Sequence, residues 1–373
     1  MRTGRKRLSG RSQACPVDER RRGRAIMSTA TKLLCLRPAD PIRLETRRTA
    51  MPRPGKGEVL VRVEATSVNP IDVKRARGYG QRLLSHKGAG KFPLVLGNDF
   101  AGEIVSVGAG VSPWRPGDRV MGLVPTGRKG GAHATHLTVD ARLVRTAVDG
   151  VASAALAAFP YTFTTLWLAL RGAGINEGNA KAQKVLVHGA SGGLGQLALQ
   201  ILAAWGASVT AICSTANIEL CRNLGATAVW DRTRCRLQEL PEHFDAGLNF
   251  GAWEDEATLI GRLRHGALGY VTAVHPLLGN IDRGGLLAGA WRSRLDWRRM
   301  QSLANAKGAR YRWIIFQPDE GALDMLHHFL ARGALTLSVG VSVSIDNADL
   351  AFEHVANHKQ GRAILLPMGA LSS

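Results

Sequence analysis

A run of small residues at 189–195 has the composition of a turn that binds phosphate. It follows a short apolar strand at 185–187 and precedes a stretch whose apolar residues recur at helical spacing. Small side chains let a backbone approach a pyrophosphate, and the N-terminus of the following helix offers N–H groups and a positive dipole end. Glycine also serves ordinary tight turns, so it is the flanking strand and helix that favour a dinucleotide site. The residues expected to hold the cofactor here are Ala190, Ser191, Gly192, Gly193 and Leu194, with Ala190 in place of the usual first glycine.

The end of the next predicted strand, 207–212, favours NADPH over NADH. An NAD site places an Asp or Glu there to bind the ribose hydroxyls. This chain instead continues with Ser214 and Thr215, and the first acid is Glu219. Without a carboxylate nothing repels a 2′-phosphate, and the two hydroxyls can donate hydrogen bonds to it. The same two residues also suit the cap of a helix beginning near Asn217, and the two roles are compatible.

Length and composition are those of a globular protein with two domains. The chain has 373 residues, of which 45% are hydrophobic and 21% charged. We expect no membrane span, because we find no apolar run that is long enough and free enough of polar residues. The five cysteines are odd in number and widely spaced, and no C-x-x-C occurs, so neither a disulfide framework nor a cysteine-rich zinc lobe is indicated. We therefore expect a reducing compartment and a cytoplasmic location.

Part of the net charge of +20 comes from the first 26 residues. Residues 1–26 hold nine basic and two acidic residues, which leaves +13 for residues 27–373. We expect residues 1–27 to be a disordered basic extension, because they show almost no apolar periodicity. Upstream sequence before a start at Met27, a targeting peptide and a nucleic-acid arm are the alternatives, and we favour the first. The remaining charge suits anionic ligands such as NADPH and does not by itself imply nucleic acid.

The pattern of the chain changes near residue 151. Before it, short alternating strands dominate, as at 59–65, where the valines share one face. After it, helices and strands alternate to about residue 310, which predicts an α/β fold with a doubly wound parallel sheet. The later strands are predicted at 246–250, 269–274, 335–345 and 363–367, and the later helices at 321–332 and 348–357.

Motifs spread along the chain resemble the medium-chain dehydrogenase/reductase superfamily. They are Ser67–Asp72, Pro93–Gly102, Arg115–Val120, the glycine turn and Gly361–Ala363. The resemblance implies a chaperonin-10-like β-rich catalytic domain, an inserted Rossmann domain and a C-terminal return to the first domain. The expected boundaries are 28–152 and 312–373 for the catalytic domain and 153–311 for the Rossmann domain.

Within the superfamily the chain is similar to the zinc-free quinone oxidoreductase and enoyl reductase branch, including the mitochondrial reticulon-interacting oxidoreductases. Zinc-dependent members have Cys before the position of Asp72 and His-Glu at 98–99, where this chain has Pro70-Ile71-Asp72 and Asn98-Asp99. His133 and His136 form an H-x-x-H, but they fall in a predicted strand over 132–139 and are not expected to be ligands. We therefore expect no metal site.

The resemblance also implies roles for single residues. Asn69 is expected to face the substrate and donate to a developing oxyanion, with an Asx-turn before Pro70 as the alternative. Tyr79 is expected to donate a proton or to shape the pocket, against the alternative of a surface loop. Thr165 is expected to contact the nicotinamide amide, unless it only bonds a backbone carbonyl in its helix. Val274, at the end of a predicted strand, is counted with the cofactor-binding residues.

Three further positions bear on the 2′-phosphate of NADPH. Asn217 stands where relatives often carry Lys, which weakens the case, and Arg232 stands where they carry Tyr and restores a cation for phosphate binding. Arg362 stands where Lys is common, and reaches either the cofactor or only the surface.

These features predict an NADPH-dependent, zinc-independent reductase of quinones or other conjugated carbonyls. The alternatives are an enoyl-thioester reductase and an NADPH-responsive protein that binds nucleic acid or a partner with little turnover. The resemblance implies a homodimer, and nucleic acid is not an expected partner. The segments 78–91 and 277–297 are predicted to be loops of the substrate pocket. Within the second, Trp291–Arg299 suits a pocket or an oligomer interface, and both remain open.

Overall fold

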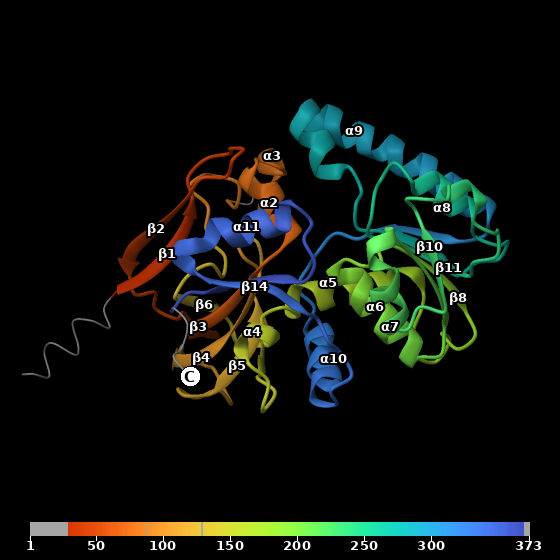
Figure 1. The fold of residues 1–373 in the computed structure, drawn as a ribbon. Coiled ribbons are helices and arrows are strands. Elements are labelled where there is room, and N and C mark those ends of the chain that lie inside the picture. Colours follow the sequence, from red (N-terminus) through yellow and green to blue (C-terminus); the bar gives the residue numbers. More distant parts are fainter. Residues whose placement is uncertain (1–28, 87, 128–129, 369–373) are drawn as a thin grey trace, which may run out of the picture.

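The computed structural model describes residues 29–86, 88–127 and 130–368, and its backbone forms two large sheets and a two-stranded hairpin, connected by helices (Figure 1). The basic extension predicted at 1–27 lies outside the described residues. One sheet is built from both ends of the chain, and the other from its middle. This is the α/β architecture that the sequence predicted.

The middle of the chain forms a six-stranded sheet in which every pair is parallel, in the order β10-β9-β8-β11-β12-β13. This is the order of a doubly wound dinucleotide-binding sheet, whose ligand crevice lies at the carboxyl ends of β8 and β11, where the order reverses. Apolar clusters cover both faces. The elements are β8 (Lys184–His188), α6 (Gly193–Ala204), β9 (Ser208–Cys213), α7 (Ile218–Asn223), β10 (Ala228–Asp231), β11 (Ala246–Asn249), α8 (Glu256–Gly261), β12 (Gly269–Thr272), α9 (Leu277–Ala306) and β13 (Arg310–Trp313).

The two ends of the chain form a seven-stranded, mostly antiparallel sheet, in which β14-β15-β3-β4-β5-β7 are neighbours and β6 also pairs with β3. A separate hairpin joins β1 (Thr29–Cys35) to β2 (Leu44–Ala50). The sheet strands are β3 (Glu58–Val68), β4 (Asp99–Val107), β5 (Arg119–Leu123), β6 (His136–Asp140), β7 (Val144–Thr146), β14 (Val339–Ser344) and β15 (Arg362–Leu366). The helices are α2 (Pro70–Ala76), α3 (Gln81–His86), α4 (Ser153–Leu156), α5 (Pro160–Ala173), α10 (Glu320–Ala331) and α11 (Ala348–Ala356).

Strand β3 follows the predicted alternation. Val59, Val61 and Val63 are fully buried, whereas Arg62 lies on the other face and pairs with Glu103 on β4 at 2.6 Å. The buried face joins the large core that continues into α5 and α6.

Several predicted boundaries are wrong. Strand β13 belongs to the parallel sheet, so the expected boundary between 311 and 312 falls inside it and the return comes after Trp313. Of the segments predicted as loops, 78–91 contains the short helix α3, and 277–297 lies entirely within α9. The strand expected over 132–139 begins only at His136, because the backbone before it crosses to β1 and to the 95–97 segment.

One stretch, Ser153–Ala173, has the length and apolar composition of a membrane span, with a mean hydropathy of 1.3, whereas the sequence analysis expected none. It comprises α4 and α5, and 67% of its most apolar window is buried inside the fold. Phe163, Leu166 and Leu170 of α5 belong to the large apolar cluster, which contains residues of both sheets. Burial between the two sheets accounts for this composition.

A buried carboxylate lies under the parallel sheet. Glu256 of α8 accepts hydrogen bonds from Tyr311 Oη at 2.7 Å, Asn249 Nδ2 at 2.6 Å and Tyr270 Oη at 3.2 Å. Burial raises the pKa of Glu256 to about 7, against the lowering effect of these donors. The folded protein therefore holds a proton here at pH values where the unfolded chain has lost it.

We expect the free energy of unfolding to fall by roughly 3 kcal/mol as the pH rises from about 5 to about 8, because the raised pKa makes ionisation costly only in the folded state. Chemical denaturation across this range measures the slope. In Glu256→Gln the part of the pH dependence of the unfolding free energy that this residue contributes disappears. In the control Glu254→Gln, at an exposed position, that pH dependence is unchanged. An unchanged slope in Glu256→Gln contradicts the assignment.

Candidate cofactor and substrate site

The turn at 189–195 connects β8 to α6 and leaves the helix N-terminus open. Gly192 is the N-cap of α6, is exposed, and has no side-chain cap. A Cβ at Gly192 would meet only Gly189 O, at 3.4 Å, whereas a Cβ at Gly195 would lie 2.4 Å from Ala190 Cα. Gly195 therefore allows the helix to pack on the strand, and Gly192 leaves space in front of the first N–H groups, as a bound pyrophosphate requires.

Arg362, the first residue of β15, points at this turn from the other sheet. A Cβ on Gly193 would lie 3.1 Å from Arg362 Nη1. Arg362 Nη2 donates to Asn69 Oδ1 at 2.6 Å and to Ser67 Oγ at 3.3 Å, while the buried Nε has no hydrogen-bond partner. Of the two roles expected for Arg362, the surface one is wrong, since only 9% of this residue is exposed. A buried guanidinium beside the turn can hold a phosphate.

A buried hydrogen-bond network holds Arg362 in place. Asp99 Oδ2 accepts from Ser67 Oγ at 2.5 Å and from Asn69 Nδ2 at 2.7 Å, and Asp99 Oδ1 accepts from Tyr161 N at the start of α5. Burial raises the pKa of Asp99, and Arg362 opposes this; burial lowers the pKa of Arg362, and Asp99 opposes that. The two opposite charges thus compensate each other through Asn69 and Ser67.

The expected role of Asn69 as an oxyanion donor does not fit this network. Its Nδ2 donates to Ser67 and Asp99, its Oδ1 accepts from Arg362, and only 2% of the residue is exposed. Asn69 is also the N-cap of α2, so the Asx alternative describes its backbone position better. The structure makes Asn69 a link between Asp99 and Arg362.

Thr165 of α5 lies one turn from the Asp99 contact. Its hydroxyl donates to Tyr161 O at 2.8 Å, as the helical alternative expected. The oxygen lone pairs remain able to accept from an amide NH2 group such as that of nicotinamide. Thr162, on the same helix, lies 3.3 Å from a Cβ built on Gly193, so the start of α5 faces the turn.

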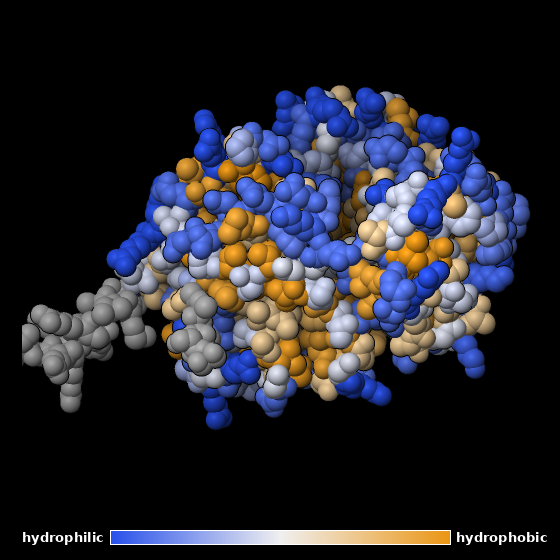
Figure 2. Space-filling model, in the orientation of Figure 1, coloured by the Kyte–Doolittle hydropathy of each residue, from blue (hydrophilic) through white to orange (hydrophobic). Residues whose placement is uncertain are grey.

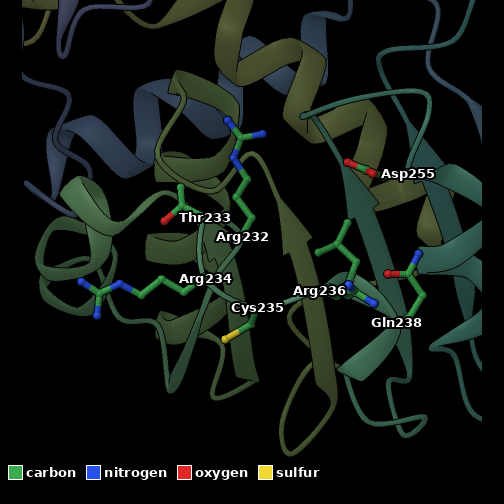
Figure 3. A pocket seen from close by; sticks show the side chains of 8 residues that line it. Arg232, Thr233, Arg234, Cys235, Arg236, Gln238 and Asp255 are labelled. Carbon is green, nitrogen blue, oxygen red and sulfur yellow. The ribbon is translucent and has the colours of Figure 1, made fainter.

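The carboxyl ends of β9 and β10 form the edge expected to meet the adenosine half of the cofactor. An open pocket of about 370 Å³ lies there, lined by Arg232–Gln238 and Asp255. Figure 3 shows the Arg232 side chain pointing upward, whereas that of Arg234 extends to the left, away from Arg232. Arg232 is exposed, and its backbone N–H bonds Cys213 O at the end of β9.

The sequence analysis missed a carboxylate at this edge. Asp231, the last residue of β10, accepts from the Thr215 hydroxyl at 2.6 Å and from Thr233, and it pairs with Arg234 at 3.7 Å. The Thr215 hydroxyl therefore already donates its hydrogen to Asp231. The expectation that this hydroxyl binds a phosphate does not fit. The hydroxyl bonds from Thr215 and Thr233 lower the pKa of Asp231, so its charge is already compensated. Ser214, which only accepts a bond from Asn217, keeps its hydroxyl hydrogen.

The remaining predicted residues are Asn217, Val274 and Tyr79. Asn217 Nδ2 donates to Ser214 and its Oδ1 accepts from Gln360 at 2.5 Å, which ties this edge of the parallel sheet to the segment between α11 and β15. Val274 follows β12 and its N–H bonds Thr272 Oγ1 at 3.3 Å. Tyr79 is half-buried against Gly279 of α9, and burial raises its pKa, with Asp282 adding to the rise.

The residues at and beside the positions that differ from those of zinc-dependent members make other hydrogen bonds. Asp72 accepts from Gly97 N and Asn69 N, and Asn98 Nδ2 donates to Val124 O. His133 is buried with Nε2 on Ser67 O at 3.0 Å. Across residues 29–86, 88–127 and 130–368, no three His, Cys, Asp or Glu side chains gather as a metal site would need.

Comparison with known proteins agrees with this fold. The family model described as an alcohol dehydrogenase GroES-like domain matches residues 55–151. NAD(P)H oxidoreductase RTN4IP1, mitochondrial, of Danio rerio is 33% identical over 324 residues, which cover 83% of this chain and 83% of that protein. The chloroplast envelope quinone oxidoreductase homolog of Arabidopsis thaliana is 36% identical over 190 residues, 50% of this chain and 56% of that protein. The solved quinone oxidoreductase from Coxiella burnetii has a TM-score of 0.77 at 21% identity, covering 91% of this chain and 99% of that one.

A GroES-like domain joined to a doubly wound sheet with an open glycine turn defines a medium-chain dehydrogenase/reductase, an oxidoreductase that uses a nicotinamide cofactor. Within that class the chain belongs to the family of the RTN4IP1 NAD(P)H oxidoreductases. The expected cytoplasmic location is wrong by the same comparison, because these relatives are mitochondrial by name.

Proposed function

We propose that this protein transfers hydride from NADPH to a quinone or another α,β-unsaturated carbonyl without zinc. The observation that carries the proposal is the pair of cationic sites on the expected dinucleotide path. Arg362 faces the glycine turn, and Arg232 stands with the free hydroxyl of Ser214 at the adenosine edge. An arginine beside a free hydroxyl suits a 2′-phosphate.

Each residue of the site has a defined task. The N-terminus of α6 and Arg362 would bind the pyrophosphate, while Asp99, Asn69 and Ser67 keep the guanidinium oriented. Thr165, whose hydroxyl donates to Tyr161 O, would accept a hydrogen bond from the carboxamide. When bound, NADPH supplies the hydride.

The chemistry of the site favours conjugated acceptors. Zinc stabilises the alkoxide in simple alcohol oxidation, and the donor set that would hold it is engaged elsewhere in this fold. A quinone or enone spreads the developing negative charge and needs less help. The relative named as a quinone oxidoreductase homolog supports this choice. Tyr79 remains the candidate proton donor; its phenol is protonated at neutral pH, and burial raises its pKa further.

Arg232→Ala should weaken NADPH binding roughly tenfold and leave NADH binding nearly unchanged, because it removes a charge-assisted bond that only the 2′-phosphate can make. Titration of the protein with each dinucleotide, followed by heat or tryptophan fluorescence, measures both dissociation constants. Arg332→Ala removes the same charge from an exposed position after α10, away from the pocket, and serves as the control. Equal weakening of both dinucleotides would remove Arg232 from the phosphate site.

A screen of NADPH oxidation with quinones, enones and simple aldehydes tests the acceptor class. We expect turnover with the first two, and no loss of rate after dialysis against a chelator. Turnover confined to simple aldehydes, or a rate abolished by chelation, would refute the proposal.

A further inference from the structure

Helix α9 is two helices in one, and its second part lies on the outside of the molecule. The backbone at Gly285 has φ of 76°, which breaks the helix there. Before this break Asp282 accepts from the backbone N–H groups of Gly80, at 2.5 Å, and Arg82, at 3.2 Å, and so ties α9 to the start of α3. After it, residues 286–306 cross the parallel sheet along the upper rim of Figure 1.

The outward side of this second part carries three large apolar side chains. Leu287, Trp291 and Leu295 are 90%, 61% and 47% exposed. They are four residues apart, so they form one seam about 12 Å long. The residues buried on this segment, Gly289, Ser293, Met300 and Ala304, lie on the opposite side of the helix. An exposed apolar seam of this kind lowers the solubility of a protein unless another surface covers it.

Four arginines line the seam on both sides. At 100° per residue, Arg294 and Arg298 fall on one flank of Trp291, and Arg292 and Arg299 fall on the other. All four are exposed. The one acid in 286–306 is Asp296, and its Oδ2 is turned inward to accept from Asn280 Nδ2 at 2.9 Å. The outward side is therefore apolar along its centre and cationic along both edges.

We propose that this side of α9, residues 287–299, docks on an anionic lipid surface. The side chains of leucine and tryptophan enter the headgroup region of such a surface, while flanking arginines reach its phosphates. In Figure 2 the rim where α9 lies is mostly hydrophilic, with apolar residues between the polar ones, as this mode of binding needs. A second copy of this chain fits less well, because pairing two identical faces would place the four arginines of one copy against the four of the other. An acidic peptide would need a groove, whereas this helix projects from the surface.

The test is co-sedimentation of the full chain with vesicles of phosphatidylcholine alone and of phosphatidylcholine mixed with phosphatidylglycerol. We expect binding only to the mixed vesicles, decreasing with salt. Trp291→Ser with Leu287→Ser should reduce the bound fraction roughly tenfold, as should Arg292→Glu with Arg298→Glu. NADPH affinity and the melting temperature should not change, because these side chains are exposed.

Two controls separate this face from the charge of the rest of the chain. Leu350→Ser removes a leucine of α11 that is 55% exposed, and Arg332→Glu reverses an exposed charge after α10; neither should alter binding. Binding that survives the α9 variants would show that charge elsewhere, including residues 1–26, carries it, and would overturn the proposal. Absence of binding to mixed vesicles would also overturn it, and a change of oligomeric state in Trp291→Ser would point to a second copy as the occupant.

Discussion

Gly192→Val should weaken NADPH and NADH binding by roughly a hundredfold and leave the fold intact. Gly192 has ordinary backbone angles, φ of −76° and ψ of 168°, and its Cβ direction is open. A valine there would fill the space before the α6 N-terminus and displace the phosphate from its N–H groups, a loss of about 3 kcal/mol. Calorimetric titration measures the affinity, and thermal unfolding checks the fold.

Gly261→Val is the matched control for this variant. Gly261 ends α8, far along the chain from the turn, and nothing lies within 4 Å of a Cβ built on it. We expect unchanged affinity there. If Gly192→Val binds NADPH as the parent protein does, then the turn has only a structural role and the cofactor site must lie elsewhere.

Arg362→Met should reduce both stability and cofactor affinity. It leaves Asp99 buried without its cation and Asn69 Oδ1 without its donor, which costs about 3–5 kcal/mol when one partner of a buried pair is removed. Urea denaturation measures the stability, and titration with NADPH measures the affinity. Arg362→Lys, which keeps the charge, should retain part of both.

A double-mutant cycle distinguishes the contribution of the Asp99–Arg362 charge pair to stability from the contribution of Arg362 to NADPH binding. Asp99→Asn together with Arg362→Met should be less destabilised than the two single variants predict, because no uncompensated charge remains. NADPH affinity should stay low in the double variant, since the cation is still missing. Additive stabilities, or affinity recovered in the double variant, would contradict the network.

The sequence predicted those parts of the fold that local patterns determine. The alternation of β3 and the strand–turn–helix around Gly192 depend on residues close in the chain, and both are confirmed. Asp231 was missed because it reaches Thr215 from the end of the adjacent strand, a contact that no local pattern encodes. Helix α9 was predicted as a loop, since Gly284 and Gly285 interrupt it and its apolar residues face outward as well as inward.

The site residues show the same division. The glycine turn could be predicted from its spacing. The expected role of Asn69 as a donor to the substrate does not fit, because its amide is hydrogen-bonded to Arg362 and Asp99. Arg362 is 293 residues away in the chain, so only the three-dimensional fold reveals their contact.

The place of β15 in its sheet links cofactor binding to protein synthesis. This strand, made among the last residues of the chain, pairs with β3, which is made among the first, and it brings Arg362 to the glycine turn. The parallel sheet is one continuous segment and can form while the ribosome is still translating. Under the proposed function, the pyrophosphate site would gain its arginine only after residue 362 has left the ribosomal tunnel, so a truncated chain lacking β15 should fold its parallel sheet yet hold NADPH poorly.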